Sequence, residues 1–519
     1  MVSDSVGLGA ISAMRTAFSG WQVTITGKPG LFTETLVSYV NSAPASAFGD
    51  DAIVATGYNY PYWDPARFDR SVDQMVAALK NRGVRHIFWV TMREVKPAYY
   101  SKWNGLNSDY RTLYLAYPHT NDQLRSATVR HPELSIIDWA SVADQTGLSY
   151  DAIHLNPTGA ALYAGLAHTT VETARTRLPA GTVTEVPVAG LHGVPADAAA
   201  VSVNVTAINP RSAGTVSVVP CGAVTPRVGN LLLRAGRTSS ISAIVKVGAG
   251  GSICVRQSTD ANVVLDLQGA SDATSGYHRV APQRVLDSGN NSIPSGSIRT
   301  VALASITGAP SGAFVAILGI SAKAALDGRV RVYTCGTTPP PVASLIATGG
   351  LRTQLLQLVR TDATGHVCVV TNGGASVSLD LFGWFDGGSA IHAIRARRML
   401  DSRSTGGALL PGLTRTLQIG GQTPVPAAAV GAAITLTLLD PAAAGTASLF
   451  PCARKPAPTT LVASVPNHAV TASAPISLAA DGRLCVRSSV RTNFTIDVSG
   501  WMGPGFVALP SQRLLDSTG

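Results

Sequence analysis

The most constraining feature of this sequence is a cysteine spacing that recurs in its C-terminal two thirds. All six cysteines lie beyond residue 200. They form three pairs, with 33 positions between the two members of each: Cys221/Cys254, Cys335/Cys368 and Cys452/Cys485. No Cys-x-x-Cys pair occurs, so the pattern does not indicate zinc. We predict one disulfide in each repeat, worth about 3–4 kcal/mol by loop-closure entropy. Such bonds form in an oxidising, extracytoplasmic compartment.

The sequence around the cysteines repeats with them. Short runs rich in Val, Ser, Thr and Ala, bounded by Gly and Pro, predict strands. An aspartate follows each second cysteine, and then a motif that begins at Arg284, Arg398 and Arg513 (RVLD, RMLD, RLLD). We therefore expect three all-β repeat domains, over residues 181–289, 290–403 and 404–519. The motif could close its own repeat or open the next one, and its Arg and Asp are expected to pair structurally.

The first 178 residues show a different pattern, in which helices and strands alternate. Helices are predicted over 7–18, 31–40, 69–82, 110–129 and 157–175, and strands over 21–25, 52–55, 86–91 and 134–139. This alternation is typical of a doubly wound α/β fold, with a parallel sheet covered on both faces. In such sheets the active site lies at the carboxyl ends of the strands.

Four short blocks fall in the loops at those strand ends. They are Ser3-Asp4-Ser5, Gly30, Gly57-Tyr58-Asn59, and the Asp151-x-x-His154 segment that precedes an Asn-Pro helix start. In this order they resemble the blocks of the SGNH hydrolases, a branch of the GDSL-type esterases. The family's first block is Gly-Asp-Ser, whereas this chain has Ser3 in place of the glycine. The resemblance implies a flavodoxin-like sheet for residues 1–178.

The resemblance also implies a role for each residue. Ser5 would be the nucleophile, His154 the general base and Asp151 the residue that orients the imidazole. The backbone N–H groups of Ser5 and Gly30 and the side-chain amide of Asn59 would form an oxyanion hole. A serine esterase of this kind needs no metal and no cofactor.

Structural alternatives exist for these residues. Asn59 could cap a turn, Asp151 could cap a helix, and His154 could be an ordinary surface histidine. The strand that should precede Ser3 is apparently missing, so we expect the native chain to start further upstream, with this strand and a signal peptide. The aromatic run Tyr58–Trp63, together with Trp103, could be a sugar platform or a packed lid.

Charge is distributed unevenly along the chain. Residues 1–180 carry 15 Lys and Arg against 15 Asp and Glu, so the formal net charge of +10 lies entirely in residues 181–519. A positive field of this kind would favour an anionic polymer as a partner. The alternative is that scattered arginines keep a secreted surface soluble. No Lys/Arg cluster marks a nucleic-acid face, and no apolar run is long enough for a transmembrane segment.

The repeats resemble the β-rich repeats appended to secreted actinobacterial cell-wall hydrolases. Together these features predict a secreted or wall-associated serine esterase. Its substrate would be an O-acetylated or short-acyl carbohydrate or cell-wall polymer, and the repeats would provide attachment. Two alternatives are a general short-chain or lipase-like esterase, and a non-catalytic surface or adhesion protein with a degenerate hydrolase domain.

Overall fold

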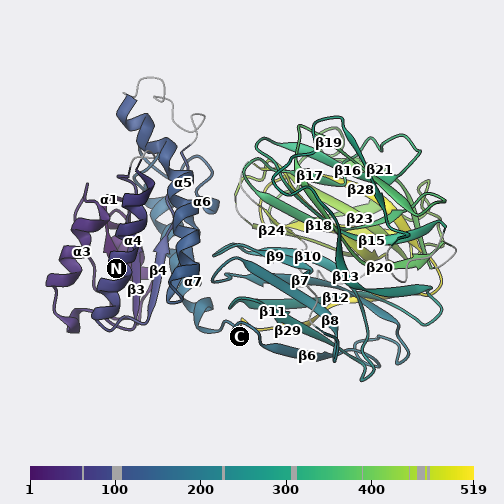
Figure 1. Cartoon of the computed structure of the whole chain (residues 1–519), viewed down its shortest axis with the longest axis horizontal. Helices are drawn as coiled ribbons and strands as arrows, with labels where there is room; N and C mark the ends of the chain where they lie inside the picture. Colours follow the sequence, from purple (N-terminus) through teal and green to yellow (C-terminus); the bar gives the residue numbers. More distant parts are fainter. Residues whose placement is uncertain are drawn as a thin grey trace.

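The chain folds into two parts that lie side by side (Figure 1). The computed structural model describes residues 1–518 except 61–63, 96–107, 225–227, 306–311, 388–389, 444, 453–461 and 465–467. The N-terminal domain (residues 1–178) combines helices with one sheet, and the C-terminal region (residues 181–519) is built from strands. In the described part of the chain, no helix is long and apolar enough to cross a membrane.

The N-terminal domain contains a five-stranded parallel sheet in the order β2-β1-β3-β4-β5. The strands are β1 (Val2–Ser3), β2 (Thr26–Gly27), β3 (Asp51–Ala55), β4 (His86–Val90) and β5 (Leu134–Ile137). The helices are α1 (Ser5–Leu8), α2 (Ile11–Ala17), α3 (Thr33–Ser42), α4 (Pro65–Asn81), α5 (Ser108–Arg130), α6 (Trp139–Val142) and α7 (Pro157–Arg175), with a 3₁₀ turn at Ala45–Ala47. The predicted alternation of helices and strands around a parallel sheet is confirmed.

Three details of this domain differ from the sequence prediction. The helix expected over 7–18 is broken near Gly9 into α1 and α2, and the strand expected over 21–25 is instead the two-residue β2. The first strand, expected to be missing, is present as the two-residue β1. It pairs with both β2 and β3 at the centre of the sheet. A strand this short still sets the position of Ser5, because α1 begins two residues after its end.

The described residues of the C-terminal region form six four-stranded antiparallel sheets, two built around the strands of each repeat. The first repeat supplies β6 (Val183–Pro187), β7 (Ala200–Ile208), β8 (Gly214–Pro220), β9 (Leu231–Leu233), β10 (Ser239–Lys246), β11 (Ser252–Gln257) and β12 (Asn262–Ser271). The second supplies β13 (Tyr277–Asp287), β14 (Ile298–Ala302), β15 (Phe314–Lys323), β16 (Gly328–Thr334), β17 (Leu345–Ala347), β18 (Arg352–Arg360), β19 (His366–Asn372) and β20 (Ser376–Asp386). The remaining strands are β21 (Ile391–Asp401), β22 (Thr414–Gln418), β23 (Gly431–Leu439), β24 (Gly445–Pro451), β25 (Val462–Ser464), β26 (Val470–Ser477), β27 (Arg483–Ser488), β28 (Asn493–Met502) and β29 (Phe506–Asp516).

These sheets form one closed, propeller-like ring, so the expectation of three successive repeat domains is wrong. The strands that carry the Arg-x-Leu-Asp motif join the sheet of the following repeat: β13 pairs with β20, and β21 pairs with β28. The last motif strand, β29, pairs with β12 of the first repeat. The motif therefore opens the next repeat, and its third copy closes the ring. Closure of this kind leaves fewer unpaired sheet edges.

The three predicted disulfides are present in the ring. They join Cys221 to Cys254, Cys335 to Cys368 and Cys452 to Cys485, which confirms the pairing expected from the spacing of 33 positions. The first cysteine of each pair directly follows a strand (β8, β16 or β24), whereas the second lies within the strand that pairs with it (β11, β19 or β27). Each bond therefore ties together two neighbouring strands of one sheet.

The two cysteines of each pair differ in burial. The second cysteines are buried, with exposed fractions of 8% for Cys254, 6% for Cys368 and 4% for Cys485, whereas the first cysteines are only partly buried. All three lie on inner strands of their sheets and are bonded into disulfides, so Cys254, Cys368 and Cys485 are structural residues.

The ionic pairs predicted for the motif are also present. Each motif arginine binds the buried aspartate that follows the second cysteine, with Nε–Oδ1 distances of 2.8 Å for Arg513–Asp266, 2.7 Å for Arg284–Asp380 and 2.7 Å for Arg398–Asp497. Each motif arginine also binds the aspartate of its own motif, Asp287, Asp401 or Asp516, so the expected pairing is present, together with a second aspartate from outside its own predicted repeat.

Ionic contacts join the ring to the N-terminal domain. Arg237 of the ring binds Asp138 at 3.3 Å, and Arg125 of α5 binds the same carboxylate. Burial acts to raise the pKa of Asp138, but the two guanidinium groups lower it to about 2. His468 binds Asp144 at 3.0 Å. These contacts hold the ring against α5 and α6 (Figure 1).

Candidate active site

The serine block occupies the turn between β1 and α1. Asp4 is the N-cap of α1, and its Oδ1 accepts a hydrogen bond from the backbone N–H of Val6 at 3.1 Å. Ser5 is the first residue of the helix and its side chain is partly exposed. Its backbone N–H is one of the four at the helix start that have no partner within the helix.

Ser3, at the position where the SGNH first block has glycine, is fully buried, and its hydroxyl has hydrogen-bond partners. Its Oγ lies 2.9 Å from the backbone oxygen of Asp4 and 3.2 Å from that of Ala55, so the hydroxyl can donate a hydrogen bond to either. The space for this side chain exists because residue 7 is glycine: a Cβ there would lie 2.2 Å from Ser3 Oγ. The substitution is therefore accommodated locally and leaves the turn at Ser5 in place.

The histidine loop lies between α6 and α7. Asn156 caps α7 by accepting from the backbone N–H of Gly159 at 2.9 Å, as the Asn-Pro start predicted. The loop is tightly turned: Ala152 has a φ of +77°, which is unusual for a residue with a Cβ. Asp151 Oδ1 accepts from the backbone N–H groups of Ile153 and His154 at 3.1 and 2.7 Å.

The three residues predicted as a triad lie in one chain of hydrogen bonds. His154 Nδ1 is 2.6 Å from Asp151 Oδ2, and His154 Nε2 is 3.0 Å from Ser5 Oγ. The side chains of His154 and Asp151 are 50% and 47% exposed, so the site opens to solvent. Although burial acts to raise the pKa of Asp151, hydrogen bonds from the His154 ring and from two backbone N–H groups bring it below its usual value. The carboxylate is therefore ionised at neutral pH and can stabilise an imidazolium.

The remaining predicted residues lie on the neighbouring loops. Gly57 follows β3 with a φ of +141°, and a Cβ there would lie 2.6 Å from Met92 Sδ, so the position requires glycine. Asn59 Nδ2 donates to the backbone oxygen of Leu31 at 3.0 Å, which ties this loop to the turn that contains Gly30. Gly30 has a φ of +73° and nothing within 4 Å of its Cβ position. Asn59 thus holds the Gly30 turn beside the strand ends.

Arg93 is a buried residue of this site that the sequence motifs did not identify. It follows β4, is 2% exposed, and its backbone N–H donates to the hydroxyl of Tyr58 at 2.8 Å. Its guanidinium donates to Ser149 Oγ at 2.6 Å and to two backbone oxygens, those of Ala152 at 3.0 Å and Gln145 at 2.6 Å. Arg93 therefore clamps the loop that carries Asp151 and His154. The only sequence indication was its place directly after a predicted strand.

Part of the aromatic run over residues 58–63 lies in the core, and the rest lies outside the described residues. Tyr58 and Tyr60 are 9% and 1% exposed, and the Tyr60 hydroxyl binds Glu34. These two rings pack in the interior, so they cannot provide a sugar platform. Tyr62, Trp63 and Trp103 lie outside the described residues.

No group of three or more His, Cys, Asp or Glu that could hold a metal is found within the described ranges of the chain.

Comparison with known proteins gives structural neighbours for the N-terminal third. The catalytic domain of Streptococcus pneumoniae peptidoglycan O-acetyltransferase A, solved with a methylsulfonyl adduct, is 25% identical and covers 33% of this chain and 91% of its own (TM-score 0.25). A lipase/acylhydrolase from Enterococcus faecalis is 15% identical over 33% of this chain and 92% of its own (TM-score 0.25). A GDSL-like lipase from Bacteroides thetaiotaomicron is 10% identical over 33% and 86% (TM-score 0.26). No protein-family model and no curated protein matches the chain.

Proposed function

We propose that the N-terminal domain is a serine esterase or acyltransferase that works through Ser5. The observation that carries the proposal is the hydrogen-bond chain from Ser5 Oγ through His154 to Asp151, with distances of 3.0 and 2.6 Å. A nucleophile, a base in contact with it and an acid that orients the base are the parts that acyl transfer requires.

In the proposed reaction, His154 Nε2 takes the proton of Ser5 Oγ as this oxygen attacks the ester carbonyl carbon. The negative charge on the carbonyl oxygen is stabilised by the N–H groups of Ser5 and Gly30 and by the Asn59 amide. His154 then gives the proton to the departing alcohol, which leaves an acyl group on Ser5. Water, or a sugar hydroxyl, deprotonated by His154, releases the acyl group and restores the serine.

The substrate we propose is a carbohydrate or cell-wall polymer that carries O-acetyl or another short acyl group. The half-exposed His154 and Asp151 favour a substrate that approaches from solvent, as an ester on a polymer surface does. The three disulfides favour a secreted or wall-associated protein.

Hydrolysis of p-nitrophenyl acetate by the full chain tests the chemistry. Ser5→Ala should lower kcat/KM by at least about 1,000-fold, whereas Ser12→Ala, at an exposed serine of α2, should leave it unchanged. If Ser5→Ala retained the wild-type rate, another residue would be the nucleophile and the triad assignment would be wrong. An inactive wild type would favour the non-catalytic alternative.

The polymer is tested separately, by measuring acetate released from an O-acetylated polysaccharide. Release that depends on Ser5 supports the polymer substrate. Hydrolysis of the small ester alone would identify a general short-chain esterase.

A further inference from the structure

The ring contains equivalent clefts, and the second of them is enlarged. It lies between β16, β18 and β21, at the junction of the second and third repeats, and has a volume of about 320 Å³. The first cleft lies at the equivalent place, between β8, β10 and β13, and has a volume of only about 20 Å³. The larger volume falls at the lower end of the range for small-ligand sites, roughly 300–1,000 Å³.

Strand pairing defines which residues correspond in the three repeats. Lys246, Arg360 and Ser477 pair with Ala200, Val315 and Gly431, which occupy the same position on the neighbouring strand. Pro220, Thr334 and Pro451 each directly precede the first cysteine of their repeat.

This correspondence shows that polar residues are concentrated in the second cleft. Its walls carry five polar residues: Tyr333, Thr334, Gln357, Arg360 and Arg395. In the same order, the first repeat has Val219, Pro220, Ala243, Lys246 and Ala281 at these positions. The third repeat has Phe450, Pro451, Ala474, Ser477 and Pro510. The first and third copies differ from each other at three of these positions, but each has only one polar side chain among the five. The presence of a polar group at all five positions of the second cleft points to a local binding role.

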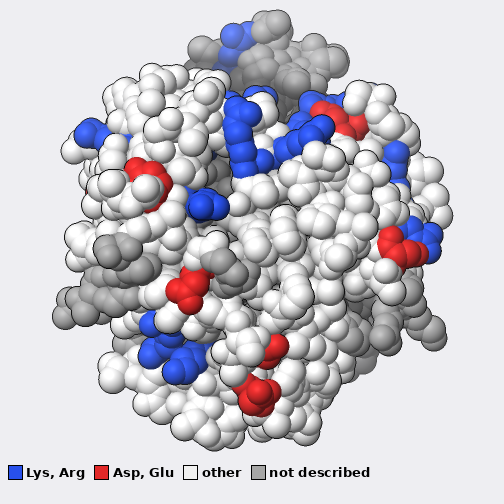
Figure 2. All heavy atoms as spheres, turned by 90° about the vertical axis from the view of Figure 1, so that its right-hand side faces the viewer, with Lys and Arg blue, Asp and Glu red and all other residues white. Residues whose placement is uncertain are grey.

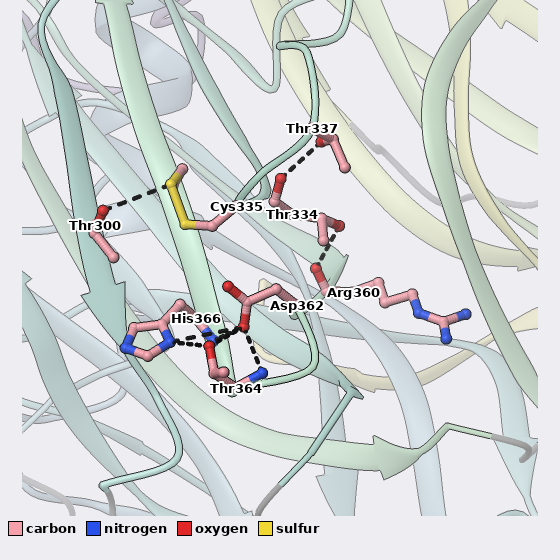
Figure 3. The surroundings of a disulfide bond; sticks show 9 residues. Thr300, Thr334, Cys335, Thr337, Arg360, Asp362, Thr364 and His366 are labelled. Atoms are coloured by element: carbon pink, nitrogen blue, oxygen red, sulfur yellow. Dashed lines mark hydrogen bonds and ion pairs between the residues drawn. A yellow bond between two sulfur atoms is a disulfide. The ribbon is translucent and has the colours of Figure 1, made fainter.

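The cleft is positively charged. Arg360 and Arg395 are both exposed, and no Asp or Glu lines the cleft. Arg395 donates to the backbone oxygen of Pro339 at 3.1 Å, whereas the Arg360 guanidinium has no ion pair within the described residues. Figure 3 shows the Arg360 side chain extending away from Asp362 and from the disulfide at Cys335. An exposed guanidinium group can bind a carboxylate or a phosphate through two parallel hydrogen bonds.

The cleft also offers groups that match sugar hydroxyls. Thr334 Oγ1 donates to the backbone oxygen of Arg360 at 2.8 Å and Thr337 Oγ1 donates to that of Thr334 at 2.7 Å, so both hydroxyls are held in place with lone pairs to spare (Figure 3). Gln357 is 6% exposed, and its Oε1 has no hydrogen-bond partner among the described residues. An unpaired buried amide oxygen costs about 1–3 kcal/mol, which a bound donor would offset.

We propose that the second cleft binds an acidic saccharide. The carboxylate or phosphate would lie between Arg360 and Arg395, and the sugar hydroxyls would contact Thr337 and Gln357. On the face of the ring that points away from the N-terminal domain, Lys and Arg side chains gather in a few groups rather than covering the surface (Figure 2). This distribution favours recognition at discrete sites over diffuse attraction to a polyanion. The proposal does not depend on the esterase function.

The test is isothermal titration calorimetry on the full chain carrying Ser5→Ala, which prevents turnover. The probes are trigalacturonate for a carboxylate, maltose 1-phosphate for a phosphate, and neutral maltotriose. We expect one acidic probe to bind and maltotriose to bind at least tenfold more weakly. Arg360→Gln and Arg395→Gln should each raise Kd several-fold, and the double substitution at least tenfold.

Lys246→Gln, at the position equivalent to Arg360 in the first cleft, is the matched control and should change Kd by less than twofold. Both arginines are exposed, so their replacement should leave the melting temperature unchanged. Failure of both acidic probes to bind would overturn the proposal. So would an unchanged Kd in the double variant, or an equal loss in Lys246→Gln.

Discussion

The two parts of the molecule use charged side chains in opposite ways. In the ring, one arrangement recurs three times, in which a motif arginine binds a buried aspartate on the neighbouring strand of the same sheet. In the N-terminal domain, the Asp151–His154–Ser5 chain occurs once, on loops, and is half exposed. Charges that repeat with the fold hold it together, whereas charges that occur once at strand ends are available for chemistry.

The same comparison applies within the ring. The motif arginines are identical in all three copies, whereas the positions of Arg360 and Arg395 carry arginine at the second cleft alone among the equivalent places in the repeats. By this criterion the motif is structural and the second cleft is a binding site. The substitutions that follow therefore test either a charged group that stabilises the fold or one that belongs to the candidate site.

The largest expected effect is on ring closure. Asp266 is fully buried, and its partner Arg513 comes from the last strand of the ring. Burial acts to raise the pKa of Asp266, and the Arg513 guanidinium opposes this rise. Arg513→Met would leave the carboxyl without its cation and should lower the free energy of unfolding by about 3–5 kcal/mol, measured by urea denaturation.

The matched control is Arg360→Met, which removes an exposed arginine of the ring and should change stability by less than about 0.5 kcal/mol. Equal effects of the two substitutions would contradict the structural role of the motif. Esterase activity of Arg513→Met under native conditions should be retained, since the triad lies in the other domain.

A smaller effect is expected from the clamp on the histidine loop. Arg93→Met removes the donors that hold Ser149, Ala152 and Gln145, so the loop should lose the geometry that brings His154 to Ser5. We expect kcat to fall about 10–100-fold with little change in KM, because misplaced catalytic groups weaken transition-state binding more than substrate binding. Arg93→Lys should recover part of kcat. A variant that lost stability but kept the wild-type kcat would show that Arg93 serves the fold alone.

The smallest effect concerns Asp4, the carboxyl group next to the proposed nucleophile Ser5. Burial raises the pKa of Asp4 to about 7, with hydrogen bonds from the backbone of Val6, Gly57 and Tyr58 opposing the rise. In the unfolded chain the group ionises near pH 4. Between these values the folded state binds the extra proton, so Asp4 makes the protein less stable as pH rises from about 4 to about 7.

Asp4→Asn keeps the cap acceptor and removes this ionisation. The melting temperature of the variant relative to wild type should therefore increase between pH 5 and pH 8, by about 2–4 °C for each kcal/mol involved. A difference that stays flat or falls with pH would contradict the raised pKa. Asp151, whose pKa is lowered, should show no such gain when it is replaced by Asn.

The sequence was most informative where the determining contacts are local or covalent. The cysteine spacing predicted the disulfides, and Asn156-Pro157 placed the start of α7 and hence the loop before it. Ring closure could not be predicted, because Arg513 and Asp266 are 247 positions apart and nothing near either residue specifies the other. Arg93 was missed because its partners are mainly backbone oxygens, which leave no motif. Ser3 suggested a degenerate site because the motif shows only that a larger residue replaces glycine. The space for the Ser3 side chain comes from Gly7, four residues further along the chain, which has no Cβ.

The central claim is that Ser5 is an acyl-accepting nucleophile, and trapping the acyl-enzyme tests it most directly. The full chain is mixed with p-nitrophenyl acetate, quenched in acid within the first turnovers, digested and analysed by mass spectrometry. We expect one acetyl group on the peptide that contains Ser5 and none in the Ser5→Ala chain. Acetyl transfer to another residue, or ester hydrolysis that proceeds unchanged in Ser5→Ala, would contradict the claim.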